Sequence, residues 1–122
     1  MSIAEIETAV RYEVPVVVVI CNDNGLGAEV HMLDVFRIPS EIATHTTPSF
    51  AAVAQAFGAE GYTVRTEADF AALEERFARP VTGPIVIDCV VNPRVRGDWV
   101  EALHSMFARA AASSSGTELV RD

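Results

Sequence analysis

The stretch Val14-Pro-Val-Val-Val-Val-Ile-Cys21, followed at once by Asn22-Asp-Asn-Gly-Leu-Gly27, decides the fold class. Its eight apolar residues show no alternation with polar ones, which predicts a central strand of a parallel sheet, covered by helices on both faces. Pro15 is tolerated because it stands at the start of the strand. The polar, glycine-containing segment that follows predicts a loop at the carboxyl end of this strand, where open α/β sheets bind their ligands.

Helical and extended segments alternate outward from this stretch. Ser2 and Glu5 form a predicted capping box, and Pro48 suits the first position of a later helix. A third helix is expected to turn Phe70, Leu73 and Phe77 inward. Helices are predicted over residues 3–13, 28–36, 48–57, 67–79 and 99–111, and strands over residues 14–21, 61–65 and 84–91.

This order predicts one α/β domain, a three-layer α/β/α arrangement around a mostly parallel sheet, over residues 1–111, with a flexible tail over residues 112–122. Only three strands are predicted. The chain begins on a helix with an apolar face, so the strand expected before that helix is missing. We therefore expect an apolar sheet edge that another strand or another chain covers.

The composition excludes several classes of protein. The chain has 122 residues, half of them hydrophobic, and a net charge of −8 with nine arginines and no lysine. This length fits one domain with a real core, and the charge excludes a basic nucleic-acid surface. Its longest apolar run is far shorter than the roughly 20 residues that span a bilayer, and its start does not resemble a signal peptide. Cys21 and Cys89 are expected to be buried free thiols of a cytoplasmic protein.

The loop after Cys21 carries the clearest chemistry. Asp23 offers a carboxylate, Asn22 and Asn24 offer amides, and two glycines let the backbone approach a phosphate closely. Oxygen ligands of this kind suit Mg²⁺, which phosphate oxygens would complete. An ordinary polar turn between strand and helix is the alternative. Gly25-Leu26-Gly27 alone does not make a dinucleotide-binding fingerprint.

Three separated segments resemble the C-terminal cofactor-binding domain of thiamine diphosphate enzymes of the acetolactate synthase and pyruvate decarboxylase superfamily. They are Glu5-Ile-Glu-Thr-Ala-Val-Arg-Tyr-Glu-Val-Pro-Val-Val-Val-Val-Ile-Cys-Asn-Asp-Asn-Gly-Leu-Gly-Ala-Glu-Val-His31, Thr47-Pro-Ser-Phe-Ala-Ala-Val-Ala-Gln-Ala-Phe-Gly58 and Gly83-Pro-Ile-Val-Ile-Asp-Cys-Val-Val-Asn-Pro93. The resemblance covers residues 1–100 in the family's order. It implies the thiamine diphosphate-binding fold, with Mg²⁺ and thiamine diphosphate as cofactors, and chemistry that forms or cleaves a carbon–carbon bond of a 2-oxo acid.

The resemblance also implies roles for residues of the loop. Asn22-Asp23 occupies the family's paired asparagines, so Asp23 would bind the metal ion through its carboxylate and Gly25 through its carbonyl. Ala28 would offer its amide to the cofactor diphosphate. Glu29 would be a catalytic acid near the reacting carbon, or an ordinary acid at the start of a helix. The implied cofactor-binding residues are Asn22, Asp23, Asn24, Gly25, Leu26, Gly27 and Ala28.

The chain departs from the family at its start. The family's Gly-Asp-Gly, whose aspartate also binds the metal, occurs nowhere in the sequence, and the domain that binds the cofactor's pyrimidine ring is absent. We expect a fragment, one subunit of a split enzyme or a misassigned start, with weak cofactor binding and no turnover alone. Its partner would be a second copy or a companion chain carrying the missing half. A non-catalytic association module is the alternative.

The other polar candidates carry weaker signals. His31, His45 and His104 share no motif and are expected to be ordinary histidines, with His31 nearest the loop. Asp88 is expected to be a buried, hydrogen-bonded carboxylate, or to lie near the rim of its strand. Further candidates are Trp99, expected in the core or at an interface, and Arg94 and Arg96, expected in a solvated loop or at an anion.

Overall fold

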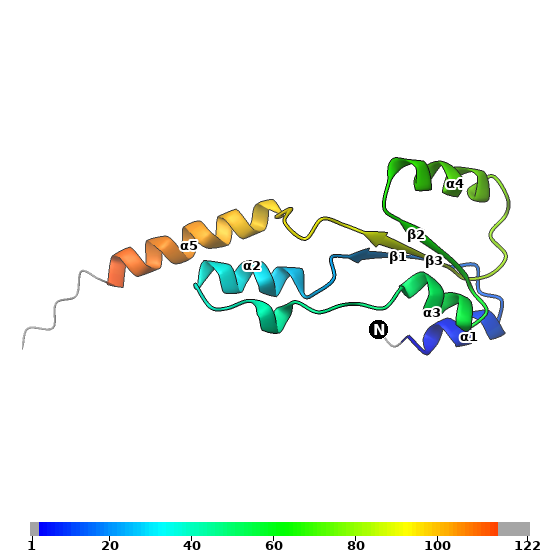
Figure 1. Ribbon diagram of the computed structural model, residues 1–122, viewed down its shortest axis with the longest axis horizontal. Helices are drawn as coiled ribbons and strands as arrows, with labels where there is room; N and C mark the ends of the chain where they lie inside the picture. Colours follow the sequence, from blue (N-terminus) through cyan, green and yellow to red (C-terminus); the bar gives the residue numbers. More distant parts are fainter. Residues whose placement is uncertain (1–2, 115–122) are drawn as a thin grey trace, which may run out of the picture.

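A computed structural model describes residues 3–114 of the chain. Its sheet has three parallel strands in the order β1-β3-β2, formed by β1 (Val17–Asn22), β2 (Glu60–Val64) and β3 (Ile85–Val90) (Figure 1). All pairs are parallel, as the apolar runs predict. Sequence-adjacent strands therefore need crossover connections, and the intervening helices supply them.

The predicted central position of β1 is wrong, because β3 occupies the centre and β1 lies at one edge. Val17 and Val19 are 40% and 58% exposed, and Cys21 on the same face is also exposed rather than buried. β3, in contrast, buries Ile85 and Val86 on its opposite faces. The outer face of β1 is thus apolar and uncovered by the described residues.

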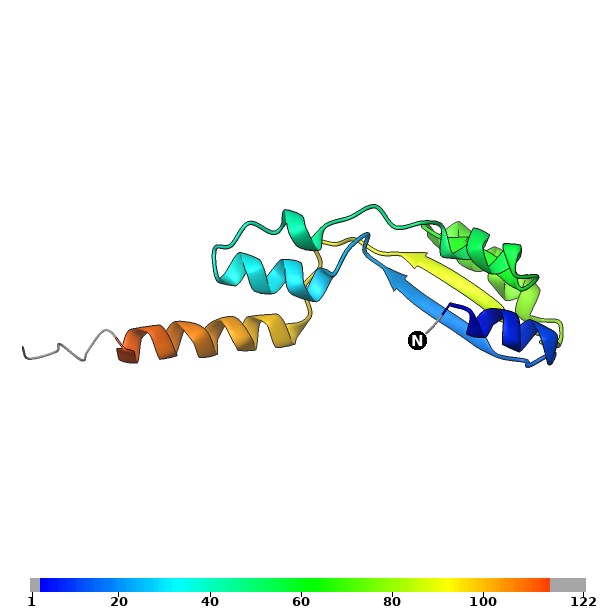
Figure 2. The ribbon, with the colours of Figure 1, turned by 90° about the horizontal axis from the view of Figure 1, so that it is seen from below.

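Five α-helices and one short 3₁₀ helix are described within residues 3–114. α1 and α3 cover one face of the sheet and α4 covers the other, while α2, η1 and α5 lie beyond the carboxyl ends of β1 and β3 (Figures 1 and 2). The bounds are α1 (Glu5–Arg11), α2 (Gly27–Val35), η1 (Glu41–Ala43), α3 (Phe50–Ala56), α4 (Glu67–Phe77) and α5 (Asp98–Ser114). None of them is both long and apolar enough to cross a membrane.

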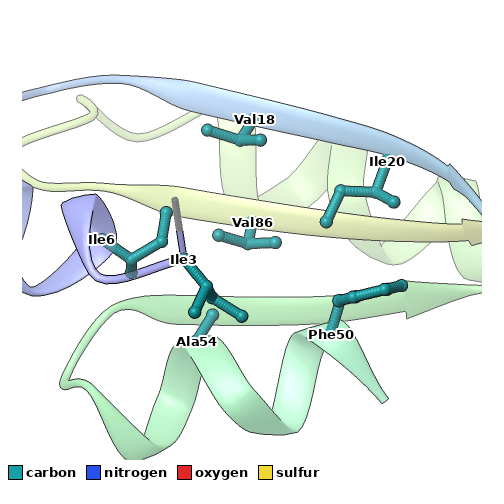
Figure 3. Close-up of a pocket in the computed structure, with 7 residues that line it drawn as sticks. All are labelled: Ile3, Ile6, Val18, Ile20, Phe50, Ala54 and Val86. Atoms are coloured by element: carbon teal, nitrogen blue, oxygen red, sulfur yellow. The ribbon is translucent and has the colours of Figure 1, made fainter. Parts of the chain in front are cut away.

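A small core forms on each face of the sheet. Under α4, Val64 and Leu73 pack with Ile85 and Ile87 of β3. On the other face, the side chains of α1 and α3 converge on β1 and β3 around an apolar groove of about 160 Å³. Figure 3 shows its lining residues, Ile3, Ile6, Val18, Ile20, Phe50, Ala54 and Val86.

Several predicted helix ends shift in the structure. α1 begins at Glu5 with Ala4 at its N-cap, whereas the predicted cap, Ser2, lies outside the described residues. The N-cap of α3 is Ser49, whose hydroxyl accepts a hydrogen bond from the amide of Ala52 at 3.2 Å. Pro48 therefore precedes the cap instead of opening the helix. α5 reaches Ser114, so the helix extends into the predicted tail, and residues 115–122 lie outside the described residues.

The predicted inward stripe of α4 is only partly correct. Leu73 is buried, but Phe70 and Phe77 are 54% and 41% exposed. The residue that α4 buries beside Leu73 is Arg76, at the next position of the same helix face. Its guanidinium pairs with Glu60 on β2, so an ion pair replaces the apolar contact expected there.

The hydrogen-bond partners of Glu60 give its carboxyl group a lower pKa in the folded protein than in the unfolded chain. Hydrogen bonds from the Arg76 guanidinium, and one from the Tyr62 hydroxyl at 2.7 Å, lower the pKa of Glu60 from 4.5 to about 2. Because the folded state has the lower pKa, this ionised carboxylate stabilises the protein fully above pH 4.5. The stabilisation is lost as the pH falls towards 2.

We expect Glu60→Gln to lower the thermal stability at pH 7 and to remove this pH dependence. Melting temperatures followed by circular dichroism should differ between wild type and variant at pH 7, and the difference should shrink as the pH falls from 4.5 towards 2. Glu74→Gln, on the exposed surface of α4, is the matched control and should parallel the wild type. A difference that stays constant with pH would contradict the role of Glu60.

Candidate functional site

Asn22 anchors the loop that follows β1. Its side-chain amide donates to the Asp88 carboxylate at 2.9 Å, and its Oδ1 accepts hydrogen bonds from the Thr47 hydroxyl at 2.9 Å and from the amide of Asn24 at 3.1 Å. Asn22 is buried, so its side chain holds the loop in place through contacts within the protein. Asn24, with a φ of 59°, turns the backbone after it.

Asp88 joins this loop to α3. It is buried on β3 and accepts hydrogen bonds from Asn22 and from the amide of Phe50 at 3.0 Å. The expected buried, hydrogen-bonded carboxylate is thus present. Because β1 and β3 are neighbours with Ile20 paired to Asp88, one side chain fixes both the loop after β1 and the start of α3.

The Asp23 carboxylate lies at the start of α2. Its Oδ1 accepts a hydrogen bond from the amide of Gly25 at 3.2 Å. Its Oδ2 lies where a Cβ on Gly27 would come within 1.9 Å, so only glycine leaves room for the carboxylate there. A negative charge at a helix N-terminus is favourable, because the helix dipole is positive at that end.

Backbone groups beside Asp23 are left free. Gly25 and Thr44 form an isolated antiparallel bridge, in which Leu26 donates to Ala43 at 2.8 Å and His45 donates to Asn24 at 3.3 Å. No donor among the described residues reaches the carbonyl of Gly25. The amides of residues 27–29, in the first turn of α2, also lack acceptors among residues 3–114, as expected at a helix N-terminus.

A cavity of about 490 Å³ opens beside these groups. It lies between the loop after β1, one face of α2, Thr44 and the segment after β3. Its polar walls include carboxylates, a histidine and two arginines. The lining residues are Asp23, Asn24, Gly25, Gly27, Val30, His31, Asp34, Thr44, Pro93, Arg94 and Arg96.

The remaining sequence candidates divide into two groups. His31, Arg94 and Arg96 line the cavity, whereas His45 and His104 are exposed and do not line it. Trp99, expected in the core or at an interface, is half-exposed at the start of α5. Arg94 and Arg96 are exposed in the loop after β3, as the solvated-loop interpretation predicts, and the strand order brings this loop to the loop after β1.

Glu29 is placed apart from this cavity. It is exposed in the first turn of α2 and borders an apolar hollow with Leu26, Met32 and Phe36. Ala28, in contrast, lines a smaller cavity together with Asp23 and His31. Within residues 3–114, no three His, Cys, Asp or Glu side chains gather closely enough to hold a metal ion by themselves.

Residues 3–114 therefore form a parallel α/β domain with a polar loop and, at the carboxyl edge of the sheet, a helix N-terminus that these residues leave without acceptors. A family model for the C-terminal TPP-binding domain of thiamine pyrophosphate enzymes matches residues 1–89. The chain belongs to this family, which confirms the resemblance found in the sequence.

Two curated relatives support this assignment. The chain is 33% identical over 91 residues to a protein named as a putative acetolactate synthase large subunit from Mycobacterium tuberculosis, and 34% identical over 99 residues to 2-hydroxyacyl-CoA lyase from Oryza sativa subsp. japonica. Each match covers 75% of this chain, but only 16% and 17% of those two proteins. The chain thus spans about one sixth of the length of these relatives.

We expect Gly27→Ala to displace the Asp23 carboxylate while leaving the fold intact. The added Cβ would meet Oδ2 of Asp23, the end of a side chain, so rotation of this carboxylate relieves the clash. The NMR signal of the Gly25 amide, which donates to this carboxylate, should shift in the variant, and an unshifted signal would contradict the displacement. Unfolding in urea should change little, and Gly83→Ala, where an added Cβ meets open space, should leave both properties unchanged.

Proposed function

We propose that this chain is the part of a thiamine diphosphate-dependent enzyme that binds Mg²⁺ and the cofactor diphosphate, in an enzyme that forms or cleaves carbon–carbon bonds of 2-oxo acids. The observation that carries the proposal is the group of free ligands around Asp23. At the carboxyl edge of the sheet meet the Asp23 carboxylate, a carbonyl and the amides of a helix start, and this carbonyl and these amides have no hydrogen-bond partner within residues 3–114.

The residues present fit these cofactors chemically. Mg²⁺ prefers carboxylate and carbonyl oxygens, completed by phosphate and water, so Asp23 and the Gly25 carbonyl would hold it. The amides of Gly27 and Ala28 would hold the diphosphate, because a helix N-terminus binds anions. The cofactor, when bound, supplies the electron sink for the carbon–carbon chemistry. The described residues position its diphosphate end.

Glu29 keeps two possible roles in this proposal. The resemblance suggests an acid near the reacting carbon. Its place in the first turn of α2 equally suits an acid that stabilises the helix start. Activity of Glu29→Gln in a complete enzyme separates the two, because only the first role predicts a loss of turnover.

We further propose that the chain associates through the uncovered side of β1. Val17 and Val19 expose apolar surface next to the free edge of this strand, and such edges recruit further strands. A second copy or a companion chain would cover them, and light scattering that shows only monomer at high concentration would contradict this.

The two free thiols fit the reducing cytoplasm, where we place the protein.

Calorimetric titration with thiamine diphosphate tests the cofactor proposal. Since Asp23 is the only carboxylate among loop residues 22–27, we expect binding weaker than micromolar and dependent on Mg²⁺, and no turnover by the chain alone. Asp23→Ala should remove the Mg²⁺-dependent part, while Glu75→Gln on the surface of α4 should not. Binding that ignores both Mg²⁺ and Asp23 would refute the loop assignment. No binding at millimolar cofactor would favour the non-catalytic association module.

A further inference from the structure

We propose that Arg94 and Arg96, together with His31, form a second wall of the diphosphate site and contact the outer phosphate of the bound group. This inference rests on the proposed function, because it assumes that Asp23 and the start of α2 hold the other end of the diphosphate. It assigns a role to the segment after β3, which the resemblance left without one.

The strand order places this segment opposite the loop. β3 runs parallel to β1, and the amide of Val91 donates to the carbonyl of Asn22 at 2.9 Å, so the two strands end together. After β3 the backbone turns tightly, because Oδ1 of Asn92 accepts a hydrogen bond from the amide of Arg94 at 3.0 Å and its carbonyl accepts one from Val95 at 3.2 Å. The turn presents both arginines to the cavity that Asp23 lines.

The charged side chains that line the cavity are two carboxylates, Asp23 and Asp34, and two guanidinium groups, Arg94 and Arg96. Arg96 pairs with Asp34 at 3.5 Å, and both side chains stay partly exposed. The Arg94 guanidinium has no hydrogen-bond or ion-pair partner among the described residues. A diphosphate next to Asp23 needs positive charge besides that of Mg²⁺, and guanidinium groups bind phosphate oxygens with two parallel hydrogen bonds.

His31 provides an independent indication of a ligand. It is 8% exposed, and its Nδ1 has no hydrogen-bond partner within residues 3–114. A buried polar atom without a partner costs free energy, so such atoms usually mark a missing water or ligand. His31 lies one helical turn after Gly27, on the same face of α2, and lines both cavities beside Asp23.

An NMR titration of the full chain with inorganic pyrophosphate tests this inference. With Mg²⁺ present, the amide signals of Gly27, His31 and Arg94 should shift together. The double variant R94Q/R96Q should bind roughly tenfold more weakly, as expected when charge-assisted hydrogen bonds are lost. Any pyrophosphate binding that the wild type retains without Mg²⁺ should also be lost in the double variant. The matched control R65Q/R109Q removes the same charge from exposed positions elsewhere and should bind as the wild type does.

The possible outcomes separate this inference from the proposed function. If R94Q/R96Q binds as the wild type does while Asp23→Ala loses the Mg²⁺-dependent part, the arginine site is refuted and the proposed function stands. If millimolar pyrophosphate shifts no signal at the loop, both are refuted. If pyruvate shifts the Arg94 signal at lower concentration than pyrophosphate does, the assignment to a diphosphate is wrong. Dispersed amide spectra of each variant confirm that it folds.

Discussion

Replacing Gly61 by alanine is expected to destabilise the protein by about 3 kcal/mol, since overpacking where backbone meets backbone cannot relax easily. A Cβ on Gly61 would lie 2.2 Å from the carbonyl oxygen of Ala51 and 3.0 Å from its Cα. α3 packs directly on β2 at this point, so the helix must move away from the sheet. That movement would also strain the hydrogen bond from Phe50 to Asp88.

Gly83→Ala is the control for this prediction. Nothing lies within 4 Å of the position that a Cβ on Gly83 would take, so the substitution should change the free energy of unfolding by no more than about 0.5 kcal/mol. Urea unfolding followed by circular dichroism gives both values. Equal midpoints for the two variants would show that α3 does not pack on Gly61 in this way.

Asp88→Ala should destabilise the protein nearly as much as Gly61→Ala does, and it should also disorder the loop after β1. It leaves the side-chain amide of Asn22 and the backbone amide of Phe50 without an acceptor. Each unsatisfied buried donor costs about 1–3 kcal/mol. Because the variant no longer buries the charge of Asp88, part of this cost is offset, and we expect the free energy of unfolding to fall by about 3 kcal/mol. The midpoint of urea unfolding should fall accordingly.

A milder replacement separates the two effects of Asp88. Asp88→Asn keeps one acceptor oxygen and should lose about half as much stability, because its NH₂ group faces one of the two donors. The signals of Asn24 and Gly25 should shift in both variants, since Asn22 fixes the loop. Glu75→Gln should change neither stability nor these signals. An Asp88→Ala variant as stable as the wild type would refute the anchoring role.

The sequence predicts the three strands and their parallel direction, but the predicted central place of β1 is wrong. The apolar runs that become β1 and β3 correctly indicate parallel strands, but only β3 has described residues packed on both of its faces. They do not reveal which strand is central, since an edge strand that another polypeptide covers carries the same pattern. The exposure of Val19 and the central place of β3 emerge only from the pairing.

Some residues of the candidate site are predictable from the sequence, and others are brought to it only by the pairing of the strands. Asp23 and Gly25 follow a strand directly, so their place at the carboxyl edge is predictable from local pattern. Arg94 lies far from them in the sequence, and only the pairing of β1 with β3 brings it to the same cavity. Helical periodicity also failed for Phe77, because the partner that decides the buried face of α4 is Glu60 on a different element.

Paramagnetic broadening by Mn²⁺ tests the central claim most directly. Mn²⁺ takes the same hard oxygen ligands as Mg²⁺, and its effect on NMR signals is strongest for nearby nuclei. With pyrophosphate present, substoichiometric Mn²⁺ should first broaden the amide signals of Gly25, Gly27 and Ala28, and Asp23→Ala should abolish this selectivity. Broadening that begins elsewhere in the described domain, or that is unchanged in Asp23→Ala, would contradict a metal–diphosphate site at this loop.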